Sequence, residues 1–401
     1  MRKLYVVMVG LPARGKSTLA RRIKECLEED GTQAAIFNNG DLRRSMLGAE
    51  STEAEFYNPE NSFGLLAREN LARRNMELAK DYLAGKGEVA IMDATNASRT
   101  RRRQIEKYFA EFPTLFIECV NEDPLLLDAC IRRKAHLPEY AAYSREEALR
   151  SFLSRIRYYE SIYSPVGEEQ HWMRVDAVTN RVIAERPCAH SPYYPAIRDS
   201  VVSTWVRCLY LVRHGQTSYN LEGRIGGDPA LTPKGLSQAR ALATHLHDKD
   251  LPYVFTSTRV RSHQFAAPLI AERPHATVLA MPEFDEIFAG ECEGMRYEDI
   301  RRDRPDVARA RAEDKYAYAY PDGESYADLN ERVRRGLARS LFLAGDAPLL
   351  IVGHQAINRT VLSLFLNQRN EDVPYIYIPQ NQYYHLSVTP RKKLFELIKF
   401  A

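Results

Sequence analysis

The sequence lacks any apolar run that approaches the roughly 18–20 residues needed to span a membrane, and its 401 residues contain no CxxC pair. The first absence argues against a transmembrane helix. The second, together with six scattered cysteines, argues against a zinc site or a disulfide framework and is typical of reduced thiols in the cytosol. The N-terminal stretch MRKLYVVMVGLP has no small-residue cleavage site, so we expect no signal peptide. We therefore expect a cytoplasmic protein.

The sequence also has little net charge, because 56 basic and 53 acidic residues leave a formal charge of +3. That balance does not by itself favour a nucleic-acid or membrane partner. The apolar fraction of 45% and the charged fraction of 27% are those of an ordinary globular protein. A chain of this length is long for one core and suits two domains of about 200 residues.

Short apolar runs alternate with segments of helical periodicity in both halves of the chain. In the first half we expect parallel strands at 3–9, 34–38, 88–93 and 114–119, with helices at 17–29, 62–85 and 98–112. In the second half we expect strands at 207–212, 253–257, 277–280 and 348–353, a helix at 233–248, and edge strands at 383–388 and 393–400. This alternation predicts two doubly wound α/β domains. A proline-bearing, aperiodic stretch near 185–205 separates them, so we expect domains at 1–200 and 206–401.

Residues 10–17 read GLPARGKS and match the pattern G-x-x-x-x-G-K-[ST] in full. Between a strand and a helix, such a loop turns successive backbone N–H groups toward a triphosphate, and the helix N-terminus adds its positive dipole end. Lys16 is then expected to reach the β- and γ-phosphates, and the Ser17 hydroxyl to ligate Mg²⁺. The residues that we expect to bind ATP here are Gly10, Leu11, Pro12, Ala13, Arg14, Gly15, Lys16, Ser17 and Thr18.

Further polar residues follow strands in the first half. Asp93 ends a strand in AIMDATN and is our candidate for the Mg²⁺ carboxylate, with a helix cap as the alternative role. Arg43 and Arg44 also follow a strand, where α/β folds collect ligand groups. Their guanidinium groups suit a phosphorylated acceptor. We expect the arginines at 101–103 to form a solvated helix face.

In the second half, two histidines stand at strand ends, His214 in LVRHGQ and His354 in IVGHQ. A neutral imidazole can attack phosphorus and carry it as a covalent intermediate. Arg213 favours the neutral form of His214 by like-charge repulsion and can stabilise the oxygens of a transferring phosphoryl group. Because parallel strands end at the same edge of a sheet, both histidines can face one crevice.

A leaving alkoxide needs a proton donor, and the stretch EFDEIFAGECEG offers several carboxylates. Position alone does not choose among Glu283, Asp285, Glu286, Glu291 and Glu293. The stretch ARAEDKYAYAYPDGESY at 310–326 mixes cations with alternating tyrosines. It is either a solvated loop beside an edge strand or a lid that grips a second phosphate.

Taken together, these motifs resemble the bifunctional 6-phosphofructo-2-kinase/fructose-2,6-bisphosphatase family over nearly the whole chain. The resemblance rests on GLPARGKS, FNNGDLRR, DATNASRTRR, RIRYYE, RHGQTSYN, GRIGGD, FTSTRVR, EGMRYEDI, DKYAYAYPDGESY and GHQAINR, which occur in the family's order. It implies an N-terminal P-loop kinase domain and a C-terminal histidine phosphatase domain like that of phosphoglycerate mutases. The fusion is more specific than either motif alone.

The resemblance also implies roles for residues in each half. In the kinase half, Lys16 and Asp93 serve phosphoryl transfer and Lys134 lies near ATP. The fructose 6-phosphate site then comprises Arg43, Arg44, Arg68, Thr95, Arg155 and Tyr159. In the phosphatase half, His214 is the nucleophile and Glu286 the proton donor. The resemblance makes His354 and Arg213 further catalytic residues, which surround the transferred phosphoryl group together with Arg261 and Asn220. The fructose 2,6-bisphosphate site then comprises Arg213, Asn220, Gly226, Arg261, Tyr297, Arg311, Lys315, Tyr326, Gln355 and Arg359.

The chain departs from the family pattern at a few positions. Gln216 replaces a glutamate after RHG, Asn121 replaces a cysteine, and the segment KAHLPEY introduces His136 and Glu139. The last three changes touch the kinase half. One alternative is therefore that the chain has only one of the two activities, and the phosphatase assignment is then the better supported.

The resemblance therefore implies an enzyme that makes and removes fructose 2,6-bisphosphate, a regulator of glycolysis. We expect it to phosphorylate the 2-hydroxyl of fructose 6-phosphate with MgATP and to hydrolyse fructose 2,6-bisphosphate at C2 through phospho-His214. No permanent cofactor is expected, and the resemblance implies a homodimer. Two rival functions are a nucleic-acid end-healing kinase–phosphatase, which the near-neutral charge disfavours, and a sensor without turnover, which the retention of Lys16, Asp93 and His214 disfavours.

Overall fold

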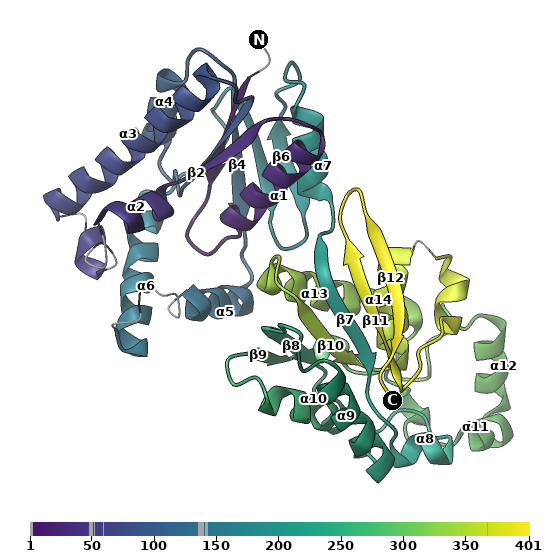
Figure 1. Cartoon of the computed structure of the whole chain (residues 1–401). Helices are drawn as coiled ribbons and strands as arrows, with labels where there is room; N and C mark the ends of the chain where they lie inside the picture. The colour runs from purple at the N-terminus through teal and green to yellow at the C-terminus, as the bar shows by residue number, and fades with distance from the viewer. Residues whose placement is uncertain are drawn as a thin grey trace. The chain divides into compact units, whose positions relative to one another are not determined.

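The computed structural model describes residues 3–47, 51, 53–58, 60–134, 140, 143–366 and 368–401. The chain forms two compact units, Met1–Thr204 and Trp205–Ala401, shown by the colour gradient in Figure 1. Among the described residues, no helix has both the length and the apolar character that crossing a membrane requires.

The first unit is built on a six-stranded sheet in the order β2-β3-β1-β4-β5-β6. Its strands are β1 (Leu4–Val9), β2 (Ala34–Asn38), β3 (Val89–Asp93), β4 (Thr114–Val120), β5 (His171–Asp176) and β6 (Arg181–Arg186). All neighbours pair in parallel except β5 and β6. Its helices are α1 (Lys16–Glu29), α2 (Asn39–Leu47), the 3₁₀ turn η2 (Ala54–Tyr57), α3 (Ser62–Ala84), α4 (Arg99–Tyr108), α5 (Pro124–Lys134), α6 (Arg145–Ser161) and α7 (Tyr194–Val202).

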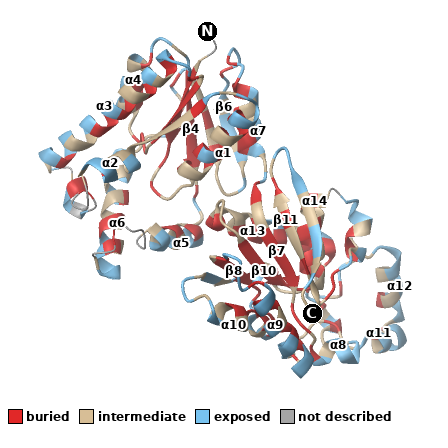
Figure 2. Cartoon of the chain, viewed as in Figure 1, coloured by how far each residue is buried: buried red, intermediate tan, exposed pale blue. Residues whose placement is uncertain are grey.

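The central strand β1 is buried along its whole length because helices cover both faces of the sheet (Figure 2). Leu4, Val6 and Met8 belong to a core that includes apolar residues of α1 and α7. Tyr5, Val7 and Val9 belong to a second core with residues of α3 and α4. Successive side chains of a strand point to opposite faces, so a two-sided core requires the continuous apolar run seen in the sequence.

The second unit has a sheet in the order β12-β11-β7-β10-β8-β9. Its strands are β7 (Val206–Arg213), β8 (Tyr253–Thr256), β9 (Thr277–Ala280), β10 (Leu349–Gly353), β11 (Gln382–Val388) and β12 (Lys393–Lys399). Strand β11 runs antiparallel to both β7 and β12. The helices are α8 (Ser218–Glu222), α9 (Pro233–His245), α10 (Val260–Ala271), η4 (Pro282–Phe284), η5 (Gly290–Cys292), α11 (Tyr297–Asp303), α12 (Pro305–Glu313), α13 (Tyr326–Ala344), α14 (Gln355–Leu366) and η6 (Asn370–Tyr375).

The predicted α/β class is confirmed, and three details of the prediction are wrong. Strands β5 and β6 were not expected. The stretch near 185–205 is not simply a linker, because it contains α7, whose Ile197 and Val201 share a core with α1. Strand β11 is not an edge strand, since it lies between β7 and β12, and only β12 is at the edge.

Candidate active sites

The loop after β1 has a backbone that only glycine fits at its first position. Gly10 has φ +131°, and a Cβ there would lie 2.6 Å from the carbonyl oxygen of Cys119. Ala13 and Gly15 also have positive φ, at 64° and 85°. The chain therefore turns tightly between β1 and α1, with Ser17 and Thr18 half-buried in the first helical turn.

Lys16 and Asp93 are buried at this loop, 9% and 4% exposed respectively. Lys16 Nζ donates a hydrogen bond to the carbonyl oxygen of Leu11 at 2.6 Å, and the Asp93 carboxylate accepts one from the Asn38 amide. Burial lowers the pKa of Lys16 to about 8, although Asp93 acts in the opposite direction. Lys134, at the end of α5, lowers this pKa further, so it lies within electrostatic range of the loop.

Three of the predicted sugar-phosphate residues gather around tyrosines. The Arg155 guanidinium lies 4.9 Å from the ring centroid of Tyr57, and that of Arg68 lies 4.7 Å from Tyr158. The rings of Tyr57 and Tyr159 are 6.2 Å apart. Burial raises the pKa of Tyr159, and Arg155 and Arg68 oppose that shift. Tyr57 was not among the predicted residues.

The other predicted residues of this half have local partners. Thr95 accepts a hydrogen bond from the Gly10 N–H through its carbonyl oxygen at 3.0 Å, which joins the DATN segment to the phosphate loop. Arg43 is buried and donates to the Ser51 carbonyl at 2.5 Å. Arg44 forms an ion pair with Asp41 on the same helix.

The expectation that residues 101–103 form a solvated face is wrong for Arg102. Its guanidinium is buried, forms an ion pair with Glu169 at 2.5 Å, and donates to the carbonyl oxygens of Ala97 and Ser164 at 2.9 Å each. Arg102 therefore ties the loop after Asp93 to a distant part of the chain. Only Arg103, with 61% of its side chain exposed, clearly fits the expectation.

Arg101 lies close to the tyrosine cluster. Its side chain is only 16% exposed and pairs with Glu69 at 3.2 Å. Burial lowers the pKa of this guanidinium, and Tyr159 contributes a shift in the opposite direction. Arg101 is therefore a further, mostly buried cation within electrostatic range of Tyr159. Sequence periodicity did not single it out, because three consecutive arginines gave no sign of which one points inward.

Of the three departures from the family pattern in the kinase half, the structure describes only Asn121. Asn121 is buried, its carbonyl oxygen accepts from Arg14, and its side-chain oxygen accepts from the Asp123 N–H at 2.9 Å. Asn121 therefore contacts the phosphate loop through its backbone. His136 and Glu139 lie outside the described residues.

In the second unit, the two histidines meet. His214 follows β7 and His354 follows β10, and these strands pair in parallel, so both residues emerge at the same edge of the sheet. The ring centroids are 5.1 Å apart. Arg261, from the first turn of α10, places its Nε 3.3 Å from His214 Nε2 and 3.3 Å from His354 Nδ1.

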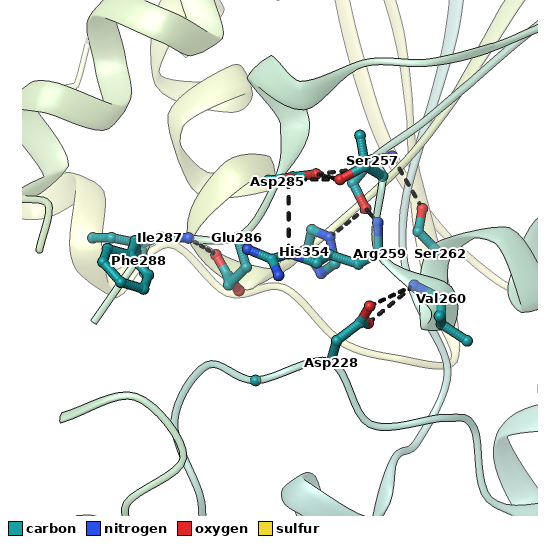
Figure 3. Close-up of polar contacts among 12 residues, drawn as sticks. Asp228, Ser257, Arg259, Val260, Ser262, Asp285, Glu286, Ile287, Phe288 and His354 are labelled. Carbon is teal, nitrogen blue, oxygen red and sulfur yellow. Dashed lines mark hydrogen bonds and ion pairs between the residues drawn. The ribbon is translucent and has the colours of Figure 1, made fainter. Parts of the chain in front are cut away.

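Hydrogen bonds fix the tautomer of each ring. His214 Nδ1 lies 2.8 Å from the carbonyl oxygen of Gly215; a carbonyl only accepts, so Nδ1 carries the proton and Nε2 keeps its lone pair. His354 Nδ1 accepts from Arg261, and His354 Nε2 donates to the Ser257 hydroxyl at 2.7 Å (Figure 3). The ring nitrogen of His214 that keeps its lone pair, Nε2, therefore faces Arg261.

Both histidines are buried, and their pKa values lie well below the ordinary 6.5. For His214 the largest cause is burial, followed by the charges of Arg261 and then Arg213. The prediction that the neighbouring Arg213 keeps the ring neutral is therefore incomplete, because burial and Arg261 contribute more.

A cavity of about 520 Å³ opens beside His214. All the predicted phosphatase residues except His354 line this cavity: Arg213, His214, Asn220, Gly226, Arg261, Glu286, Tyr297, Arg311, Lys315, Tyr326, Gln355 and Arg359. Segment 310–326 thus contributes cations to the cavity and is not merely a solvated loop. Burial, with Arg311 and Arg359 nearby, lowers the pKa of Lys315 to about 8. Tyr320 and Gln380 also line the cavity and were not predicted.

The structure separates the candidate proton donors. Only Glu286 among the five lines the cavity, where it accepts from the backbone N–H groups of Gln355 at 3.0 Å and Ala356 at 3.2 Å at the start of α14. The other four carboxylates have other partners: Glu283 pairs with Arg339, Asp285 accepts from Thr258 (Figure 3), Glu291 pairs with Arg304, and Glu293 accepts from the Gly227 N–H.

Asp228 supports the position of Arg261. Its carboxylate accepts from the Val260 N–H at 3.0 Å, at the start of α10 (Figure 3). It also lies 3.4 Å from Arg261 Nη1, which donates to the Gly227 carbonyl at 2.7 Å. Asp228 therefore holds the start of helix α10, and Asp228 and Gly227 together hold the Nη1 end of the Arg261 guanidinium.

Comparison with known proteins follows the division into two units. The chain matches the model of the 6-phosphofructo-2-kinase family over residues 1–185 and that of the histidine phosphatase superfamily (branch 1) over residues 209–400. Among solved structures, an alpha-ribazole phosphatase from Shigella flexneri has a TM-score of 0.44 and 24% identity, with 48% of this chain and 96% of that chain covered.

Two similar relatives span most of the sequence. A 6-phosphofructo-2-kinase/fructose-2,6-bisphosphatase from Caenorhabditis elegans is 37% identical over 408 residues, covering 96% of this chain and 86% of the relative. 6-phosphofructo-2-kinase/fructose-2,6-bisphosphatase 4 from Rattus norvegicus is 34% identical over 385 residues, covering 93% of this chain and 80% of the relative. The chain belongs to the 6-phosphofructo-2-kinase/fructose-2,6-bisphosphatase family.

Proposed function

We propose that residues 1–200 phosphorylate fructose 6-phosphate at its 2-hydroxyl with MgATP and that residues 206–401 hydrolyse fructose 2,6-bisphosphate at C2. As a family member with both domains, the chain is a bifunctional kinase and bisphosphatase. The proposal assigns each reaction to its residues. The observation that carries it is the buried His214–Arg261–His354 group beside a cavity that also holds Glu286.

In the phosphatase reaction, His214 Nε2 attacks the phosphorus of the C2 phosphate while the bond from phosphorus to the sugar oxygen breaks. Glu286 donates its proton to that oxygen, Arg213 and Arg261 hold the phosphoryl oxygens, and His354 keeps Arg261 in position by accepting its Nε–H. Water then attacks the phosphohistidine, giving its proton to Glu286, and the P–N bond breaks to release phosphate. Arg311, Lys315 and Arg359 bind the phosphate that remains on the sugar.

In the kinase reaction, the loop Gly10–Ser17 holds the ATP phosphates through backbone N–H groups and Lys16. The Ser17 hydroxyl and the Asp93 carboxylate are oxygen donors of the kind Mg²⁺ prefers, so they fit the metal that accompanies ATP. The cluster of Arg68, Arg155 and Tyr159 binds the sugar phosphate, with Arg43, Arg44 and Thr95 at the loops beside it. Catalysis then rests on positioning and charge neutralisation.

The remaining parts of the proposal concern location and assembly. We propose a cytoplasmic homodimer whose partners are small molecules and not nucleic acid or membranes. The net charge of +3 supports the exclusion of an end-healing enzyme.

A steady-state assay with three substrates tests this proposal. The purified chain should form fructose 2,6-bisphosphate from fructose 6-phosphate and MgATP, and should hydrolyse the bisphosphate at C2. It should neither add nor remove phosphate at the ends of a labelled oligonucleotide. Turnover of the oligonucleotide, or no detectable activity with either sugar phosphate, would contradict the proposal.

A further inference from the structure

The segment from Pro374 to Gln380 contacts the phosphatase cavity at every second residue. The carbonyl oxygen of Pro374 accepts from Lys315 Nζ at 3.2 Å, and that of Ile376 accepts from Arg359 Nε at 2.8 Å. The carbonyl oxygen of Ile378 lies 3.4 Å from Arg213 Nη1, the longest of the three contacts. One short segment therefore holds three cations that come from distant parts of the chain.

The fourth contact of this segment is made by a side chain. Gln380 Nε2 donates to the side-chain oxygen of Asn220 at 2.8 Å and lies 3.3 Å from the backbone oxygen of His214. The same Asn220 oxygen also accepts from the Thr217 N–H at 3.0 Å. Because that oxygen already has two donors, the amide of Asn220 is oriented with its NH₂ group free for another acceptor.

Two of the three residues between these contacts are exposed, whereas Pro379 is buried. Tyr375 and Tyr377 are 64% and 65% exposed. Tyr375 still contacts a residue that lines the cavity, because Lys315 Nζ lies 4.4 Å from the centroid of its ring. For Tyr377 the backbone oxygen is engaged instead, accepting from the Tyr384 hydroxyl at 2.8 Å.

We infer that Pro374–Gln380 is a positioning strap for the phosphatase site, with Tyr375 fixing the cation at one end and Gln380 fixing the nucleophile loop at the other. The inference rests on the proposed function, which places the transferred phosphoryl group near His214 and the remaining phosphate near Lys315. Cations in one cavity repel one another, so each needs an acceptor to hold it before substrate arrives. Backbone carbonyls supply that acceptor without the full negative charge that would compete with phosphate.

The two ends of the strap predict different kinetic effects. Tyr375→Ala removes a cation–π contact at the remaining-phosphate end, so KM for fructose 2,6-bisphosphate should rise about two- to fivefold with kcat nearly unchanged. Gln380→Leu removes two hydrogen bonds at the nucleophile end, so kcat should fall about tenfold with little change in KM. Tyr375→Phe keeps the ring and should restore the wild-type KM.

Tyr377→Ala is the matched control, since Tyr377 is equally exposed on the same segment and should leave both constants unchanged. The unfolding temperature, measured on the same preparations, shows that each variant is folded, and unchanged kinase activity shows that the first unit is unaffected. Equal effects of Tyr375→Ala and Gln380→Leu on both constants, or no effect of either, would overturn the inference. A wild-type chain without bisphosphatase activity would instead refute the proposed function. The strap would then be tested by measuring the dissociation constant of fructose 2,6-bisphosphate, which should rise for Tyr375→Ala and not for Gln380→Leu.

Discussion

At the scale of single residues, the phosphatase site depends on keeping two imidazoles neutral next to guanidinium groups. The Arg261 Nε–H lies between the lone pairs of His214 and His354, 3.3 Å from each. A proton added to either buried ring would face this fixed charge. Burial and Arg261 therefore act together to keep the His214 ring neutral, which is the form that the proposed nucleophile requires.

This arrangement predicts that neither ring protonates near pH 6.5. Because both pKa values lie well below 6.5, the ring resonances of His214 and His354 should not shift between pH 7.5 and pH 6, when followed by NMR of histidine-labelled protein. The variants His214→Ala and His354→Ala assign the two signals. A titration midpoint near or above pH 6.5 for either ring would contradict the account.

The buried Lys16 of the phosphate loop predicts that the rate of the kinase reaction depends on pH. Burial lowers the pKa of Lys16 to about 8, and the charged form, present below that pH, is the one that holds phosphate. Values of kcat/KM for ATP report the free enzyme, so they should fall as pH rises through about 8. A profile that stays flat to about pH 9.5, near the ordinary lysine pKa of about 10.4, would show that Lys16 keeps its usual affinity for the proton.

At the scale of elements, Arg102 links α4 and the loop after β3 to the segment before β5. Its ion pair with Glu169 is almost fully buried, with 1% and 4% of the two side chains exposed. Removing one partner of a buried pair leaves the other charge uncompensated, which costs about 3–5 kcal/mol. Because Ala97 and Ser164 also accept from Arg102, the loop that carries Thr95 loses its support as well.

Arg102→Met should therefore lower the free energy of unfolding of the first unit by about 3–5 kcal/mol. Arg103→Met, one position along the same helix with an exposed side chain, should change it by less than about 0.5 kcal/mol. The urea dependence of hydrogen exchange in the β1 and β4 peptides measures both. Equal stability of the two variants would mean that the buried pair contributes nothing net.

Several of the strands that apolar runs predicted are buried on both faces, although β9 and β12 were also predicted and are largely exposed. Strands β1, β3 and β10 are wholly buried and read as continuous apolar runs. Strand β6, with the sequence RVIAER, is mostly exposed at the sheet edge and has no such run. Helix α7 begins with Pro195 in its first turn, and prolines nearby suggested a linker, although proline is well tolerated at a helix start.

The sequence predicted residues of the candidate sites only where they belong to contiguous motifs. Residues in contiguous motifs, such as Lys16, His214 and Glu286, were found from the sequence and its resemblance. Tyr57 and Gln380 were missed because their contacts join segments far apart in the chain, and no local pattern marks them. The inward direction of Arg102 likewise depends on Glu169, 67 residues away.

At the scale of the whole molecule, the two units have separate hydrophobic cores. Residues of α1, α7 and β1 share one core, and residues of α9, α10 and β7 share another. Lys16 and Asp93 lie in the first unit, whereas His214, His354 and Glu286 lie in the second. Each reaction therefore has its own set of residues, which predicts that single substitutions separate the activities.

The most direct test is to measure both reactions, and acid-labile labelling by fructose 2,6-bisphosphate carrying labelled phosphate at C2, in the variants Lys16→Met and His214→Ala. Lys16→Met should lose kinase turnover while hydrolysis and labelling persist. His214→Ala should lose labelling and hydrolysis while kinase turnover persists. Labelled protein in the His214→Ala variant, or loss of both reactions in either folded variant, would contradict the account of two independent phosphoryl-transfer sites.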